Sequence, residues 1–272
     1  MKVPEQKPIP AFEYKEHKTL QTLKLVAISE LGPHIFSLSC NNNSFAETLI
    51  KEEGYPEYPG CELAKFSPIN GKTLAVVTVK GIHLVDMESK TERIFIERRG
   101  IIALEWSPKE RYLISCEKQK EGLKNLNVWD ANTGAHVIDF EWKNTAKDGP
   151  NSIKFDADEK FCARQVTKNV IEVFDSTNFK EPKMQIKAKL PPLPKLNGEP
   201  QIDNRVDNSK FDGFLFCPIP ADVKNTSSAS NYLMAWQNGE VLSSEEDNGL
   251  VYVYDLNSNL QRPKFNIACP KA

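Results

Sequence analysis

Three kinds of residue in this sequence could do chemistry: a lysine in a phosphate-loop-like tripeptide, the cysteines and the histidines. Gly71-Lys72-Thr73 has the ending of a phosphate-binding loop, but Phe66 stands where the first glycine of such a loop belongs. The flanking apolar runs predict a strand, a hairpin and a second strand, whereas a phosphate-binding loop leads into a helix. The tripeptide therefore predicts a hairpin turn and no nucleotide site.

The six cysteines and four histidines also lack the spacing that metal binding or nucleophilic catalysis requires. No two cysteines form a Cys-x-x-Cys pair, and no two histidines have metal-ligand spacing. Cys116 and Cys162 each fall in a strand that follows a turn, where a thiol acts as a small packing group. His83 lies within a predicted strand, where we expect a packed or hydrogen-bonded imidazole. We therefore expect no enzyme, no cofactor and no metal.

Basic side chains are in modest excess between residues 90 and 124, with nine lysines and arginines against six acidic residues. One interpretation is an ordinary solvated surface. In the other, Arg98, Arg99 and the loop from Lys118 to Lys124 lie on one rim and meet a few phosphates of ribosomal RNA, which would fix position without reading sequence. The candidate contact residues are Arg98, Arg99, Lys109, Arg111, Lys118, Lys120 and Lys124.

The composition of the whole chain of 272 residues does not indicate a protein that wraps nucleic acid around an extended basic surface. The formal net charge is −2 and the isoelectric point is near 6.2, whereas such proteins often have values above 9. The first 17 residues contain no apolar signal segment. The longest apolar run, Leu74–Val79, is strand-sized and too short to cross a bilayer. We expect a cytoplasmic protein that does not contact membranes.

The elements that must position these residues form a repeat. Each unit opens on an aromatic residue and a turn, and the three openings are Phe66-Ser67-Pro68, Trp106-Ser107-Pro108 and Phe155-Asp156-Ala157. Each unit closes on a strand that ends in aspartate, at Asp86, Asp130, Asp175 and Asp255. These aspartates are 44, 45 and 80 residues apart. A period of about 40–45 residues built of short strands is typical of propeller blades, and the carboxylates are expected to accept N–H groups of the following turns.

The sequence thus predicts an all-β fold, an incomplete WD40-like β-propeller of about four to five four-stranded blades. Residues 1–20 are expected to form a flexible leader and residues 21–272 the partial propeller. Clear blades are predicted at about 60–100, 101–142 and 150–188, and an irregular one at about 210–267. Two strand-like runs between 20 and 39 suggest a degenerate first blade, and residues 45–52 suggest a short helix. Exposed apolar faces are expected on the terminal sheets.

Several of these segments resemble one family of translation factors. The matching pieces are Phe66-Ser67-Pro68, Leu104–Lys109, Asn125–Gly134 and Asp158–Arg164. The series Asp-Glu-x-x-Cys-Ala-Arg at 158–164, followed by a strand and Asn178-Phe179, is the most specific. Between about Gly60 and Phe179 the chain resembles eukaryotic translation initiation factor 2A, a WD-repeat initiation factor. The propeller of subunit b of initiation factor 3 has a similar blade but resembles this chain less around 125–130.

The resemblance implies a β-propeller that binds the small ribosomal subunit, assists delivery of initiator methionyl-tRNA and is not an enzyme. It also implies mRNA and other initiation factors as partners, and a part in translation regulation. Members of that family continue through further blades and a lysine-rich C-terminal region, which this sequence does not show. We therefore expect a truncated or divergent member. The competing hypotheses are a WD-repeat scaffold unrelated to translation and an enzyme that uses a propeller cleft.

Overall fold

The computed structural model describes most of the chain. The described residues are 22–41, 44–69, 71–118, 124–142, 153–188, 209–217, 232–237, 249–258 and 263–269. The predicted leader at 1–20 and Lys120 lie outside these ranges.

All described secondary structure is β-strand, arranged in five antiparallel sheets. The first two sheets consist of β1 (Thr22–Ser29), β2 (Gly32–Asn41) and β3 (Ser44–Lys51), then β4 (Leu63–Phe66), β5 (Thr73–Val77), β6 (Gly81–Asp86) and β7 (Thr91–Glu97). The third and fourth consist of β8 (Ile101–Trp106), β9 (Tyr112–Glu117), β10 (Leu126–Asp130) and β11 (His136–Phe140), then β12 (Ile153–Phe155), β13 (Phe161–Thr167), β14 (Val170–Asp175) and β15 (Met184–Lys187). The fifth consists of β16 (Gly213–Phe216), β17 (Tyr232–Gln237), β18 (Gly249–Asp255) and β19 (Phe265–Cys269).

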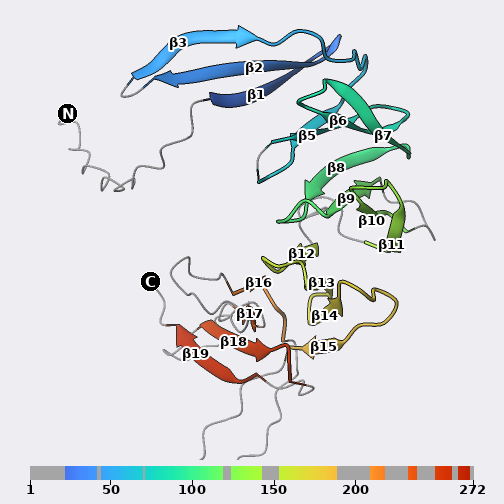
Figure 1. Cartoon of the computed structure of the whole chain (residues 1–272). Coiled ribbons are helices and arrows are strands. Elements are labelled where there is room, and N and C mark those ends of the chain that lie inside the picture. Colours follow the sequence, from blue (N-terminus) through green and yellow to red (C-terminus); the bar gives the residue numbers. More distant parts are fainter. Residues whose placement is uncertain are drawn as a thin grey trace, which may run out of the picture.

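The sheets follow one another along an open arc, with the first at the top of Figure 1 and the last at the bottom. In every sheet the strands lie side by side in chain order, so the first strand of a sheet is always at one edge. These first strands face the inside of the arc, where β1 packs against β4, β4 against β8, and β12 against β16. This is the arrangement of propeller blades around an axis. The predicted all-β, incomplete WD40-like propeller is confirmed.

The short helix predicted at 45–52 is wrong, because this segment is strand β3. It pairs antiparallel with β2, in a register that places Phe36 opposite Lys51 and Leu38 opposite Leu49. A helix of eight residues is marginal in water, because few hydrogen bonds repay the cost of nucleation. Pairing with the long strand β2 instead supplies backbone ladder bonds at both ends of the segment, with an irregular register between Leu38 and Cys40, so tertiary context overrides local propensity.

The hydrophobic core is divided into four clusters, one at each junction between neighbouring sheets. Ile35 of the first sheet packs with Leu74 of the second, and Leu84 packs with Leu113 of the third. The cluster between the fourth and fifth sheets includes Phe161 and Leu233, neither of which has exposed surface. Each sheet therefore depends on its neighbours for burial, as in other repeat architectures.

The aspartates that close the third strand of each blade hold the turns that follow them. Asp86 Oδ1 accepts the backbone N–H of Ser89 at 2.7 Å. Asp130 Oδ1 accepts that of Thr133 at 2.9 Å, and Asp175 repeats the arrangement with its own turn. The hydrogen bonds from Ser89 are the main cause of a lowered pKa at Asp86. The predicted role of these carboxylates in the turns is confirmed.

In the second, third and fourth blades, the turn after the first strand also depends on one side-chain acceptor. Ser67 Oγ accepts the N–H of Thr73 at 3.3 Å, and Ser107 Oγ accepts that of Tyr112 at 2.8 Å. In the third of these turns the acceptor is a carboxylate, since Asp156 Oδ1 takes the N–H group at the start of β13 at 2.7 Å. Asp156 is 1% exposed. At the equivalent positions of the other two turns, the serine hydroxyl accepts the hydrogen bond and brings no charge into the interior.

Replacement of Asp156 by serine is expected to stabilise the fold at neutral pH. Burial raises the pKa of this carboxyl above its ordinary value of 3.8, although three backbone N–H groups oppose the effect. An acid whose pKa is higher in the folded than in the unfolded state favours folding while protonated, and this advantage disappears as pH rises through the native pKa. Asp156→Ser should therefore raise the free energy of unfolding by about 0.5–2 kcal/mol at pH 7.

The measurement is urea unfolding of both proteins across the acid range. The difference between Asp156→Ser and the parent should shrink as pH falls towards the ordinary carboxyl value of 3.8. Stability curves that stay parallel across this range would mean that the carboxylate is not penalised by burial.

Candidate functional site

The hairpin connections divide the arc into two opposite faces. In the third sheet Ile101 pairs with Glu117 at one end and Trp106 with Leu113 at the other. We call the end at Glu117 the crossover face, since the links between sheets, such as residues 98–100, also emerge there. We call the other end the hairpin face, which includes the turns at 67–72, 107–111 and 156–160. Residues on opposite faces are separated by the length of a strand.

The structure divides the predicted basic residues between these two faces. Arg98, Arg99, Lys118 and Lys124 lie on the crossover face, where the backbone N–H of Lys118 donates to the carbonyl of Gly100 at 3.2 Å. These four residues share one face in the described part of the chain. The other two predicted contact residues in the described part of the chain, Lys109 and Arg111, precede β9 and lie on the hairpin face. Their predicted contact with RNA stays a prediction.

Two of these four predicted contact residues are already paired. The Arg98 guanidinium contacts the carboxylate of Glu117, and Lys124 Nζ lies 2.8 Å from Asp139 Oδ1. The side chains of Arg99 and Lys118 are exposed. In the described part of the chain neither of these two forms an ion pair, so both can offer charge to a partner.

Neighbouring hairpins add residues that the sequence did not single out. The turn between β5 and β6 presents Val79, 61% exposed, next to the exposed Lys80. The end of β13 and the turn after it repeat the combination with Val166, 37% exposed, and Lys168. The sequence could have indicated these positions. In both blades an apolar residue and then a lysine stand at or just after the end of the predicted second strand.

The segment that gave the most specific resemblance serves the junction between blades. Glu159 Oε1 accepts the backbone N–H of Lys109, in the preceding blade, at 2.6 Å. The Arg164 guanidinium lies 4.2 Å from the centre of the Phe140 ring, also in the preceding blade, and bonds Glu172 Oε2 at 3.1 Å. Through these contacts Glu159 and Arg164 join the fourth blade to the third. They give the segment a structural role, with no partner required.

The predicted packing roles of the cysteines and of His83 are confirmed. Cys116 and Cys162 are buried in the same cluster between the third and fourth sheets. Burial raises the pKa of the Cys116 thiol to about 11 and that of Cys162 further, so neither is a nucleophile at neutral pH. His83 lies between Thr78 Oγ1, at 3.0 Å from Nε2, and Glu92 Oε2, at 2.8 Å from Nδ1. This imidazole is held by hydrogen bonds within its blade.

Within the described ranges, no group of three or more histidine, cysteine or acidic residues could hold a metal ion. The same part of the chain contains no helix long and apolar enough to span a membrane.

Comparisons with known proteins agree with the fold. No protein-family model and no curated protein matches the sequence. Among solved structures, one described as a eukaryotic initiation factor matches at a TM-score of 0.60 and 21% identity, over 88% of this chain and 51% of the other. A mitotic checkpoint complex chain matches at 0.44 and 14% identity, over 98% and 73%, and hydrazine synthase from Kuenenia stuttgartiensis at 0.42 and 18%, over 80% and 52%. The chain spans about half the length of the initiation factor.

Fold and comparisons together define the class of this protein. It is an all-β protein that forms an open arc of WD40-like propeller blades, with a solved initiation factor among its structural neighbours. At 21% identity that likeness shows the fold alone.

Proposed function

We propose that this protein is a non-enzymatic, cytoplasmic translation-initiation factor of the propeller type, which docks on the small ribosomal subunit through its crossover face. The main observation behind the proposal is the gathering of Arg98, Arg99, Lys118 and Lys124 at one end of the third blade. A cluster of this size suits a few phosphates of ribosomal RNA and fixes position without reading bases. The resemblance between residues 60 and 179 and the initiation-factor fold neighbour point to the same process. Assistance to initiator-tRNA delivery, with mRNA and other initiation factors as further partners, belongs to this proposal.

Charge reversal of the two exposed cations is expected to weaken association with 40S particles. Arg99→Glu and Lys118→Glu should each lower the affinity about tenfold in low salt, because a phosphate contact becomes a repulsion. Each should also reduce the slope of log affinity against log salt concentration by about 0.7–0.9. Co-sedimentation with purified 40S particles at several salt concentrations measures both effects.

Lys180→Glu is the matched control, since this exposed lysine lies on the hairpin face, beyond the closing aspartate of its blade. It makes the same change of net charge and should leave co-sedimentation unaltered. A parent chain that stays in the soluble fraction at low salt would refute ribosome docking, as would equal losses in all three variants.

A scaffold that assembles proteins outside translation is the second candidate. The observation that favours it is exposed apolar residues on both faces of the first sheet, since the register puts Ile28, 44% exposed, and Ile50, 55%, on one face and Leu25, 42%, on the other. Surface of this kind is typical of protein–protein contacts. Affinity capture that returns a defined complex free of ribosomal proteins would support this function over the first.

A further inference from the structure

The hairpin face has a pocket of about 560 Å³ where the second, third and fourth sheets meet. Its walls include Arg93 of β7, Trp106 of β8, Arg111 just before β9, and Glu159 just before β13. Pockets that hold ligands commonly measure about 300–1,000 Å³. The volume therefore suits a few residues of a partner. This pocket lies on the face opposite the basic rim, so what it binds is independent of the proposed ribosome contact.

The acidic residues around the pocket are engaged by the protein itself. Glu110 Oε1 accepts the backbone N–H of Ile69 at 2.7 Å, and Glu159 Oε1 accepts that of Lys109 at 2.6 Å. Asp158 Oδ1 lies 2.6 Å from Lys109 Nζ. Each of these carboxylates holds one blade to the one before it. Their charges thus serve the junctions between blades, although they still contribute to the potential in the pocket.

Two arginines keep most of their hydrogen-bonding capacity. A guanidinium has five N–H donors, and Arg93 uses one of them on the carbonyl oxygen of Ala131 at 3.0 Å. Arg111 is exposed and lies 5.2 Å from the centre of the Tyr112 ring. Among the described residues, neither arginine forms an ion pair. The backbone N–H of Ala131 also donates to the carbonyl of Arg111, at 2.9 Å. Ala131 therefore contacts both arginines.

The positive and negative side chains in the pocket favour a peptide carboxylate over a nucleic-acid backbone. A phosphate backbone brings a continuous row of negative charges, and several of them would meet Glu110 or Asp158. A single carboxylate can instead accept a bidentate contact from a guanidinium, and both arginines line this pocket. Apolar surface close by is limited to Ile69, bonded to Glu110 and 61% exposed, and to the edge of the largely buried Trp106, 7% exposed, which lines the pocket. This combination matches a segment in which acidic and apolar residues alternate.

We propose that this pocket binds an extended acidic peptide segment of a protein partner, with an aspartate or glutamate carboxylate held by Arg93 and Arg111. The neighbouring apolar residues of the segment pack near Trp106 and Ile69. The hairpin face is then a second interaction surface, and the propeller can hold two partners at once.

The test uses the full chain and a fluorescein-labelled peptide amide of sequence Gly-Glu-Leu-Glu-Leu-Glu-Gly, read by fluorescence anisotropy at low salt. Arg111→Gln is the lead variant, because this side chain is exposed and packs against the Tyr112 ring, so its loss should disturb the fold little. We expect its affinity for the peptide to fall about tenfold, as for loss of a bidentate charged contact. Arg93→Gln should show a similar loss, and thermal melting of both variants checks that they are folded.

Two controls separate this proposal from the ribosome contact. Arg99→Gln, on the opposite face, should leave the affinity for the peptide unchanged, and a peptide with glutamine in place of glutamate should bind at least about tenfold more weakly. The proposal is overturned if both arginine variants bind within twofold of the parent, or if the glutamine peptide binds equally well. It is also overturned if single-stranded uridine decamer binds more tightly than the peptide through these same arginines. Ribosome association can fail while this peptide contact persists, and the reverse also holds.

Discussion

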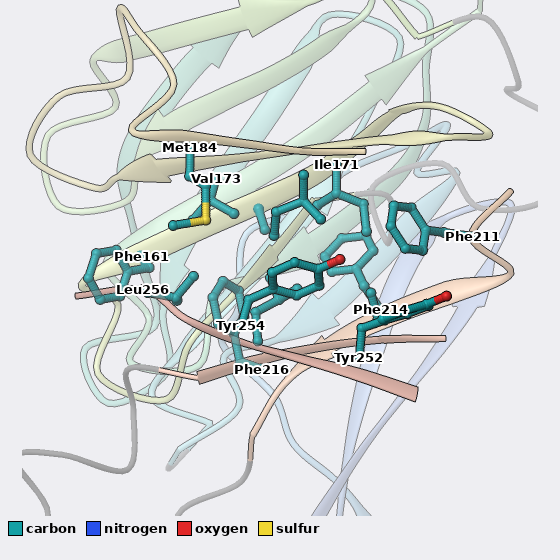
Figure 2. Packing of buried hydrophobic residues seen from close by; sticks show 14 of the residues in the cluster. Phe161, Ile171, Val173, Met184, Phe211, Phe214, Phe216, Tyr252, Tyr254 and Leu256 are labelled. Carbon is teal, nitrogen blue, oxygen red and sulfur yellow. The ribbon is translucent and has the colours of Figure 1, made fainter. Parts of the chain in front are cut away.

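Replacement of Phe161 by alanine is expected to lower the free energy of unfolding by about 3–5 kcal/mol. Phe161 begins β13 and has no exposed surface. Figure 2 shows its ring at one end of the cluster between the fourth and fifth sheets, close to Leu256. Removal of the ring takes buried apolar area away and leaves a cavity that the surrounding strands cannot fill completely. Urea unfolding followed by tryptophan fluorescence measures the loss.

The repeat architecture predicts where this loss is felt. Each sheet is buried by its neighbours alone, so a cavity at the last junction weakens the fourth and fifth sheets before the others. Amide hydrogen exchange should accelerate in β14 and β17, and protection in β5 should stay close to that of the parent. Uniform loss of protection along the whole arc would contradict the description of the chain as a series of separately packed junctions.

Phe95→Ala is the matched control for the size and chemistry of the deletion. Phe95 is 44% exposed in the outer strand β7, where its ring lies 4.8 Å from that of His83. Alanine there should cost no more than about 1 kcal/mol, because most of the lost contact is with solvent and one neighbouring ring. A cost equal to that of Phe161→Ala would mean that burial does not decide the difference.

The repeat could be predicted from the sequence because local residue patterns mark where each blade begins and ends. An aromatic residue and a turn open each clear unit, and an aspartate that caps the next turn closes it. Gly71, expected at a position of positive φ, has a φ of 61°. These signals are local, since the residues that form each turn are adjacent in the chain. The segment at 45–52 failed for the opposite reason, because its pairing with β2 is a tertiary contact.

The candidate site could be predicted only in part, because sequence order does not show which end of a strand a loop occupies. Residues 98–124 form one basic stretch in the sequence, yet β9 passes through it and carries Arg111 to one face and Lys118 to the other. Once the strands are placed, the alternation of ends assigns each loop to a face. The pocket on the hairpin face involves three blades, and no spacing within one blade indicates it.

The contacts of Glu159 and Glu110 with the preceding blades also escaped sequence reasoning. Both residues have positive φ, of 55° and 65°, a conformation in which glycine is common and glutamate is not. In the first long turn Gly71 takes this conformation. The strained backbone at the two glutamates is retained because the side chain reaches back to an N–H group of the previous blade.

Replacement of Glu159 by alanine should therefore lower the free energy of unfolding by about 1.5–3 kcal/mol, the usual worth of a hydrogen bond to a charged group. Glu159 is 3% exposed, and its bond to the Lys109 N–H at 2.6 Å connects the third and fourth blades. Glu159→Gly should cost less than Glu159→Ala, by up to about 1 kcal/mol, because glycine relieves the strain at φ 55°. Urea unfolding of the two variants measures both effects.

Replacement of Glu110 by alanine tests the same kind of contact at the junction between the second and third blades. Glu110 accepts the Ile69 N–H at 2.7 Å but is only half-buried, so water can replace its carboxylate and Glu110→Ala should cost less than Glu159→Ala. Glu181→Ala, at an exposed position of the fourth blade, should stay within about 0.5 kcal/mol of the parent. Equal costs at all three positions would show that the carboxylates do not join the blades. In that case the acidic residues of the pocket would be open to a partner, and a cationic segment would fit it better than an acidic one.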